Sequence, residues 1–306
     1  MTRNHTLGVL CVLLSAVLFS AKSVLVKLAY QYPVNPETLL LLRMLFALPF
    51  FLGMLWMAHE PGRPLSAKEW LGVGLAGSAG YYGASILDFM GLAYISASLE
   101  RLILFMYPTL TVFISALFLK IVITRRIWLA IALSYAGMLL VFAGDVSTAS
   151  PHLWLGSLLV FGGALAYAAY LVASGVLIRA VGAARFTALA LGTATLCSVL
   201  HFSLSRPWSD LGGLPKPLWG ICIALGFFCT FLPASLITQG IRHIGASQAA
   251  LIGAVGPVIT LMMGAVFLDE RVSLIQAAGG CLVLAGVILI SRQSASRTVA
   301  SSTGTE

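Results

Sequence analysis

The stretch Gly91-Leu92-Ala93-Tyr94-Ile95-Ser96-Ala97-Ser98 decides the fold, because a version of it occurs a second time in the chain. The second version, Gly240-Ile241-Arg242-His243-Ile244-Gly245-Ala246-Ser247, begins 149 residues later. The correspondence continues without a gap from residues 91–141 to residues 240–290, and it aligns Pro108 with Pro257. Self-similarity of this length indicates that an ancestral unit of about 150 residues was duplicated.

The composition places this duplicated chain in a membrane. Of its 306 residues, 59% are hydrophobic and 9% are charged, which is too little polar surface to cover a soluble globule of this size. Apolar segments long enough to cross a bilayer as helices recur along the whole chain. We therefore predict an all-α integral membrane protein with ten transmembrane helices, at residues 5–30, 36–57, 69–93, 97–119, 126–144, 153–178, 185–204, 217–240, 246–268 and 272–291.

The number of helices in each half sets the relation between the halves. Five is an odd number, so the second half must enter the membrane from the opposite side and the two repeats are inverted. We expect the first five-helix repeat at residues 1–145 and the second at residues 146–292. Residues 293–306, which are rich in Ser and Thr, are expected to form a disordered cytoplasmic tail.

The net charge of +8 is explained by membrane topology. With the N-terminus inside, the cytoplasmic loops and tails hold eleven Lys and Arg residues, whereas the outer loops hold only Arg206, Lys216 and Arg271. This bias is expected of a multi-pass protein of the plasma membrane, here the bacterial inner membrane, with both termini cytoplasmic. We therefore expect membrane lipid, and no nucleic acid, among the partners.

The five cysteines all fall within predicted spans, where they are typical of small apolar residues. We expect no disulfide framework, no metal site and no cofactor. His201 and His243 are interpreted as packing or interface residues.

Several local patterns point to one family. Phe19-Ser20-Ala21-Lys22 followed by Lys27, and Pro36 with Arg43, occupy the first two predicted helices. The duplicated stretches described above continue through Pro108 in the first half, and through Pro257 to Phe267-Leu268-Asp269-Glu270-Arg271 in the second. In their order and spacing, these patterns resemble the EamA-type transporters of the drug/metabolite transporter superfamily over essentially the whole chain.

The resemblance implies two inverted five-helix halves around a central cavity, with alternating access driven by rocking of the halves. Proteins similar to this one move amino acids, nucleotide-related compounds, sugars or drugs, often outward. The chain departs from the family pattern at two places. Lys22 stands where the family has an uncharged Asn, and Leu119-Lys120-Ile121 ends the first half where the family typically has a Glu like Glu270.

Charged residues inside the predicted spans are candidates for function. A charge at mid-membrane costs roughly 2.5 to 3.5 kcal/mol on insertion scales, so each one calls for a partner or a role. Counting about 1.5 Å per residue from the outer helix ends places all of them in the outer half of the first repeat. Six such residues lie in the first four spans: Lys22, Lys27, Arg43, Asp88, Glu100 and Arg101.

These six residues carry a net charge of +2, which an anionic group would relieve in a medium of low dielectric constant. We hypothesise that Lys22 and Arg43 bind a carboxylate or similar anion of the substrate. Lys27, Asp88, Glu100 and Arg101 are candidates for an outer gate or for proton coupling. In a purely structural alternative, the shallow side chains reach the headgroups, and Asp88 or Glu100 pairs with Lys27 or Arg101.

Polar residues at helical spacing predict faces that line a cavity, although ordinary hydrogen bonding between helices is an equal alternative for any one of them. Ser78, Tyr81, Ser85 and Asp88 form a stripe on the third helix, Glu100, Tyr107 and Thr111 on the fourth, and Tyr167, Tyr170 and Ser174 on the sixth. Pro108 and Pro257 remove a backbone hydrogen bond at matching positions of the fourth and ninth helices, and we interpret them as hinges.

These features predict a secondary active transporter that exports a small metabolite, such as an amino acid or another carboxylate-bearing compound, as a monomer or homodimer. The alternatives are a membrane-embedded enzyme acting on a lipid-linked substrate, and a channel or sensor without coupled transport. No catalytic residue is predicted, because the two intramembrane acids lie twelve positions apart on different helices with no His nearby in sequence. No Gly-Lys-Ser/Thr phosphate loop is present, which argues against direct ATP drive.

Overall fold

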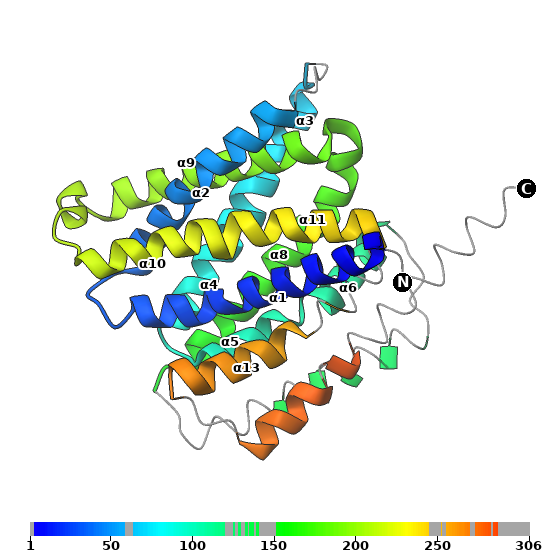
Figure 1. The fold of residues 1–306 in the computed structure, drawn as a ribbon, viewed down its shortest axis with the longest axis vertical. Coiled ribbons are helices and arrows are strands. Elements are labelled where there is room, and N and C mark those ends of the chain that lie inside the picture. The colour runs from blue at the N-terminus through cyan, green and yellow to red at the C-terminus, as the bar shows by residue number, and fades with distance from the viewer. Residues whose placement is uncertain are drawn as a thin grey trace, which may run out of the picture. The chain divides into compact units, whose positions relative to one another are not determined.

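The computed structural model describes residues 3–58, 64–119, 151–244, 255–269, 273–282 and 284–286, together with residue 252 and short pieces between residues 125 and 140. Within these residues the chain forms helices and short connections and contains no strand (Figure 1). The all-α class is thus confirmed, and the protein is a multi-pass membrane protein. Six helices of the described residues are long and apolar enough to cross a membrane: His5–Ala29, Pro36–Trp56, Ala97–Phe118, Leu153–Ile178, Ala184–Ser205 and Lys216–Ile237.

Helical residues occur in all ten ranges predicted from the sequence. Four of these ranges are single α-helices: α1 (Arg3–Ala29), α2 (Pro36–Ala58), α8 (Leu153–Val181) and α9 (Ala183–Ser205). The fifth range is described only in short pieces and the ninth mainly from residue 255 onward. The tail at residues 293–306 lies outside the described residues.

By packing, the described residues form two compact units. Unit 1 takes its residues from Met1–Val24, Ser96–Pro151 and Leu232–Glu306, and unit 2 from Leu25–Ile95 and His152–Phe231. Each unit therefore contains segments of both sequence repeats. The repeat boundary at residues 145 and 146 is a division of the sequence and stays a prediction.

Unit 2 is held together by close helix packing around small residues. It contains α2, α3 (Ala67–Leu75), α4 (Ala84–Leu92), α8, α9 and α10 (Lys216–Gly226), and α4 packs against α8. A Cβ added at Gly91 of α4 would lie 2.5 Å from Val160 Cγ2 and 2.8 Å from the Gly156 carbonyl oxygen of α8. Only glycine fits this approach, because such distances are shorter than van der Waals contact.

Two π-helical segments interrupt the third and eighth spans. Segment η1 (Ala76–Gly83) joins α3 to α4, and segment η3 (Phe227–Phe231) joins α10 to α11 (Leu232–Ile244). The 149-residue offset carries η1 onto residues 225–232, a range that contains η3. The third span, predicted at residues 69–93 as one regular helix, thus contains a wider turn that the sequence pattern did not indicate.

Unit 1 contains the first part of α1, α5 (Ala97–Leu104), α6 (Tyr107–Leu119), α11 and α13 (Gly256–Phe267). Hydroxyl groups of α1 tie it to its neighbours, since Ser15 Oγ donates to the Pro233 carbonyl oxygen at 2.8 Å and Ser20 Oγ to the Gly256 carbonyl oxygen at 2.9 Å. Such bonds to backbone oxygens satisfy polar groups that have no water to bind in a bilayer.

Both predicted hinge prolines stand at the start of a helical segment. A turn at residues 105–106 separates α5 from α6, whose second residue is Pro108. Pro257 is likewise the second residue of α13, and residue 255 before it lies in a turn. Thr111 Oγ1 donates to the Tyr107 carbonyl oxygen, and Thr260 Oγ1 donates to that of Gly256, so the repeat preserves this local arrangement. A proline lacks the amide proton that a continuous helix needs here, which explains both breaks.

Candidate functional site

The first cluster of buried charge lies in unit 1, where α1 meets the first turn of α5. Lys22 Nζ forms an ion pair with Glu100 Oε1 at 3.2 Å, and Ser23 Oγ donates to Glu100 Oε2 at 2.5 Å. Glu100 is fully buried and Lys22 is 8% exposed. The helix favours the carboxylate at this place, because the N-terminal end of a helix carries a partial positive charge.

Lys22 and Ser23 are thus two partners of Glu100 in the structure. The structural alternative, in which Asp88 or Glu100 pairs with Lys27 or Arg101, stays a prediction. Lys27 belongs to unit 2.

Arg101 lies beside the start of α13 in unit 1. A Cβ at Gly256 would be 3.1 Å from Arg101 Nη2, so the guanidinium packs against the backbone just before Pro257. The Nε atom of Arg101 is buried without a hydrogen-bond partner among the described residues. Arg101 is therefore next to one of the two helix breaks.

Arg43 forms the second centre, in unit 2, where it is 5% exposed. Its Nε donates to Thr230 Oγ1 at 2.9 Å, and its Cζ lies 5.3 Å from the centroid of the Phe89 ring. Thr230 belongs to η3, and its hydroxyl donates to the Leu225 carbonyl oxygen five residues earlier. The π-helical segment thus positions the side chain that holds Arg43.

The end of α4 gathers three more polar groups of unit 2. Lys27 Nζ donates to the Leu92 carbonyl oxygen at 3.0 Å, and the Tyr30 hydroxyl donates to the Phe89 carbonyl oxygen at 2.6 Å. A lysine at this place is favourable, because the last carbonyl groups of a helix carry partial negative charge. Asp88, one turn earlier on α4, is buried and packs near Gly163 of α8.

The predicted cavity tyrosines are partly brought together. In unit 2 the Tyr170 ring lies 5.9 Å from the rings of Tyr81, Tyr167 and Phe186, stacked on the last two and edge-on to the first. Tyr107 belongs to unit 1, where its ring lies 6.1 Å from that of Phe105.

The predicted serine positions lie on η1 and α4. Ser78 donates to the Gly74 carbonyl oxygen of its own helix, and Ser85 is partly buried on α4. Ser78 and Tyr81 lie in the π-helical segment η1, whereas Ser85 and Asp88 lie in α4, so the predicted stripe runs across two kinds of helix.

Sequence reasoning missed several polar residues with defined contacts. Ser23, Tyr30 and Thr230 hold charged or backbone groups, and the hydroxyl of Tyr82 is hydrogen-bonded to His201 Nδ1. A polar residue one position from an intramembrane charge, as Ser23 is beside Lys22, was the available signal. Groups of three or more His, Cys, Asp or Glu side chains that could hold a metal ion are absent from the described residues.

Comparison with known proteins gives consistent results. The model of the EamA-like transporter family matches residues 6–143 and 154–292. The uncharacterized transporter YcbK of Bacillus subtilis (strain 168) is 30% identical over 284 residues, which cover 90% of each chain, and the uncharacterized transporter sll1319 of Synechocystis sp. is 25% identical over 95% of each. A solved crystal structure with 19% identity matches 94% of this chain and 98% of its own with a TM-score of 0.66.

Proposed function

We propose that this chain, which belongs to the EamA-like transporter family, is a secondary active transporter that exports a small carboxylate-bearing metabolite by alternating access. The family and the names of the relatives point to a transporter rather than an enzyme. The substrate, the direction and the mechanism are the parts that we add.

The observation that carries the proposal is the pair of buried cations, Lys22 and Arg43. Both stand in apolar helices, where an isolated charge is costly. A substrate anion would offset that cost at Arg43, and at Lys22 it would take the place of the Glu100 carboxylate. Arg43 presents a planar guanidinium that suits a carboxylate, and its other contacts are to a hydroxyl and an aromatic ring.

Glu100 supplies the coupling step in this proposal. A carboxylate that binds Lys22 must compete with Glu100, and protonation of Glu100 would release Lys22 for the substrate. The protein would then hold either the substrate on Lys22 with Glu100 protonated, or the ion pair of Lys22 with the Glu100 carboxylate. This alternation couples the substrate to a proton. Asp88, Lys27 and Arg101 remain candidates for the gate, and Pro108 and Pro257 for the hinges.

The orientation rests on the distribution of positive charge. We infer a bacterial inner-membrane protein with cytoplasmic termini, because Lys and Arg are concentrated in the loops that this orientation places inside.

Flux measurements in proteoliposomes test the function. We expect saturable flux of amino acids or organic anions that accelerates with a substrate on the opposite side. A channel would show no such acceleration, and an enzyme would show chemical conversion of the substrate.

The site is tested by Lys22→Asn and Arg43→Gln in the same vesicles. Each substitution should raise KM for the carboxylate substrate at least about tenfold, as expected when an ion-paired contact is lost. Wild-type kinetics in both variants would refute the assigned roles. Flux that ignores a pH gradient, with normal transport by Asp88→Asn and Glu100→Gln, would refute proton coupling.

A further inference from the structure

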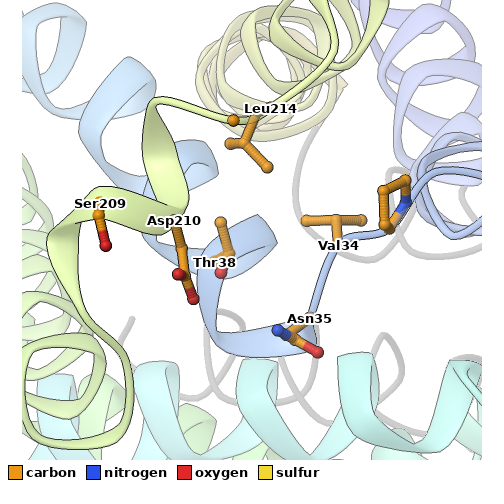
Figure 2. A pocket seen from close by; sticks show the side chains of 8 residues that line it. Val34, Asn35, Thr38, Ser209, Asp210 and Leu214 are labelled. Atoms are coloured by element: carbon orange, nitrogen blue, oxygen red, sulfur yellow. The ribbon is translucent and has the colours of Figure 1, made fainter.

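A cavity of about 340 Å³ lies in unit 2, and none of the charged residues described above lines it. It is formed where the connection between α1 and α2 meets the connection between α9 and α10, which contains the short helix η2 (Trp208–Leu211). Figure 2 shows side chains from both connections around the same space. A volume of this size is in the range of sites for small molecules.

Four polar side chains line this cavity: Asn35, Thr38, Ser209 and Asp210. Thr38 is 2% exposed and Asn35 is partly buried, whereas Ser209 and Asp210 are exposed. The cavity therefore opens to the surface at Ser209 and Asp210 and is closed off at Thr38. A small molecule that enters it meets the polar groups of both connections.

The cavity lining carries one negative charge and no positive charge, which favours a cationic ligand. Asp210 contributes a carboxylate, and no Lys or Arg lines the cavity. The nearby Arg206 has its guanidinium 4.0 Å from Glu37, so its charge is directed to that carboxylate. Val34 and Leu214 supply apolar walls opposite the polar groups. The combination of one carboxylate, neutral oxygen acceptors and an aliphatic wall suits a short alkylammonium group.

We propose that this cavity binds a small primary amine, with its ammonium group on Asp210 and the oxygen atoms of Ser209, Thr38 and Asn35 as additional acceptors. The alkyl part of the ligand packs against Val34 and Leu214. The site shares no lining residue with Lys22 or Arg43 and does not depend on the transport proposal.

Calorimetric titration of the full chain in detergent, with propylamine as the probe, tests the site. We expect saturable binding with a Kd of about 1 mM, and binding of 1-propanol at least about tenfold weaker, because the alcohol lacks the charge that Asp210 recognises. Absence of propylamine binding up to about tenfold above that Kd would overturn the proposal, and so would equal binding of the alcohol.

Two variants assign the binding to the cavity. Asp210→Asn should weaken propylamine binding about tenfold or more, and Thr38→Val should weaken it about threefold through the lost acceptor. Asp269→Asn is the matched control, since it removes the same charge from a helix end in unit 1 and should bind as the wild type does. Unchanged binding in Asp210→Asn would refute the site.

The amine-binding measurement and the transport measurement can fail separately. Wild-type flux of a carboxylate substrate without amine binding would support the proposed function and refute this site. Amine binding without any flux would support this site and refute the proposed function.

Discussion

Lys22 in unit 1 and Arg43 in unit 2 are buried to a similar degree but are stabilised in different ways. Lys22 lies against the carboxylate of Glu100, so the charge of the pair is balanced. Arg43 is held by the Thr230 hydroxyl and the Phe89 ring, and no carboxylate of the described residues forms an ion pair with it. The comparison teaches that an anion can approach Arg43 directly, whereas it must displace Glu100 to reach Lys22.

The largest effect is expected on the Lys22 side of this comparison. Glu100→Gln leaves a buried ammonium group without its counter-charge, and breaking a buried pair typically costs about 3 to 5 kcal/mol. We expect a large drop in the midpoint of thermal unfolding in detergent. Lys22→Met combined with Glu100→Gln should recover much of the loss, because the double variant leaves no uncompensated charge.

If Glu100→Gln alone unfolds at the same temperature as the wild type, Lys22 does not depend on Glu100 for its stability, and the contrast with Arg43 is wrong. Arg43→Met gives the second measurement. It should lower the unfolding midpoint less than Glu100→Gln does, because Arg43 has no ion-paired carboxylate among the described residues.

A smaller effect is expected where α10 approaches α2 beneath Arg43. A Cβ at Gly226 would lie 2.7 Å from Phe46 Cβ and 3.0 Å from the Arg43 carbonyl oxygen. Gly226→Ala should therefore push η3 away from α2, weaken the contact of Thr230 with Arg43, and cost about 1 to 3 kcal/mol of unfolding free energy.

Gly220→Ala on the same helix is the control for that substitution. No atom lies within 4 Å of the added Cβ, so the variant should be neutral or slightly stabilising. Equal stability of the two variants would contradict the close approach.

The smallest effect is expected at Thr230 itself. Thr230→Val removes one hydrogen bond to a charged group and should cost about 1.5 kcal/mol. Thr230→Ser keeps the hydroxyl and should stay near the wild type in thermal unfolding. In flux measurements, Thr230→Val should raise KM more than it lowers kcat, because it loosens a binding group; the opposite pattern would speak against a role for Arg43 in binding.

The apolar segments and the repeat were enough to predict a helical membrane protein. A helix that crosses a bilayer needs about 20 consecutive apolar residues, and such segments are visible in the hydropathy of the sequence. The π-helical segments η1 and η3 were not predicted. A π-turn differs from an α-turn by one residue and leaves no periodic signal in a helix whose faces are all apolar.

Burial of the charged candidates could be predicted from the sequence, but their partners could not. The charged residues of the first four spans are buried or partly buried, as their position in apolar segments indicated. The pair of Glu100 with Lys22 was not predicted. Depth along the membrane axis follows from counting residues, whereas the side of a helix that carries a charge depends on how the helices are rotated, which an all-apolar pattern does not indicate.

The paired π-helical segments bear on the ancestry of the molecule. Two independent insertions would have had to strike the same turn of two helices, so a shared inheritance is the simpler history. The extra residue then predates the gene duplication, and a single-copy ancestor already carried it.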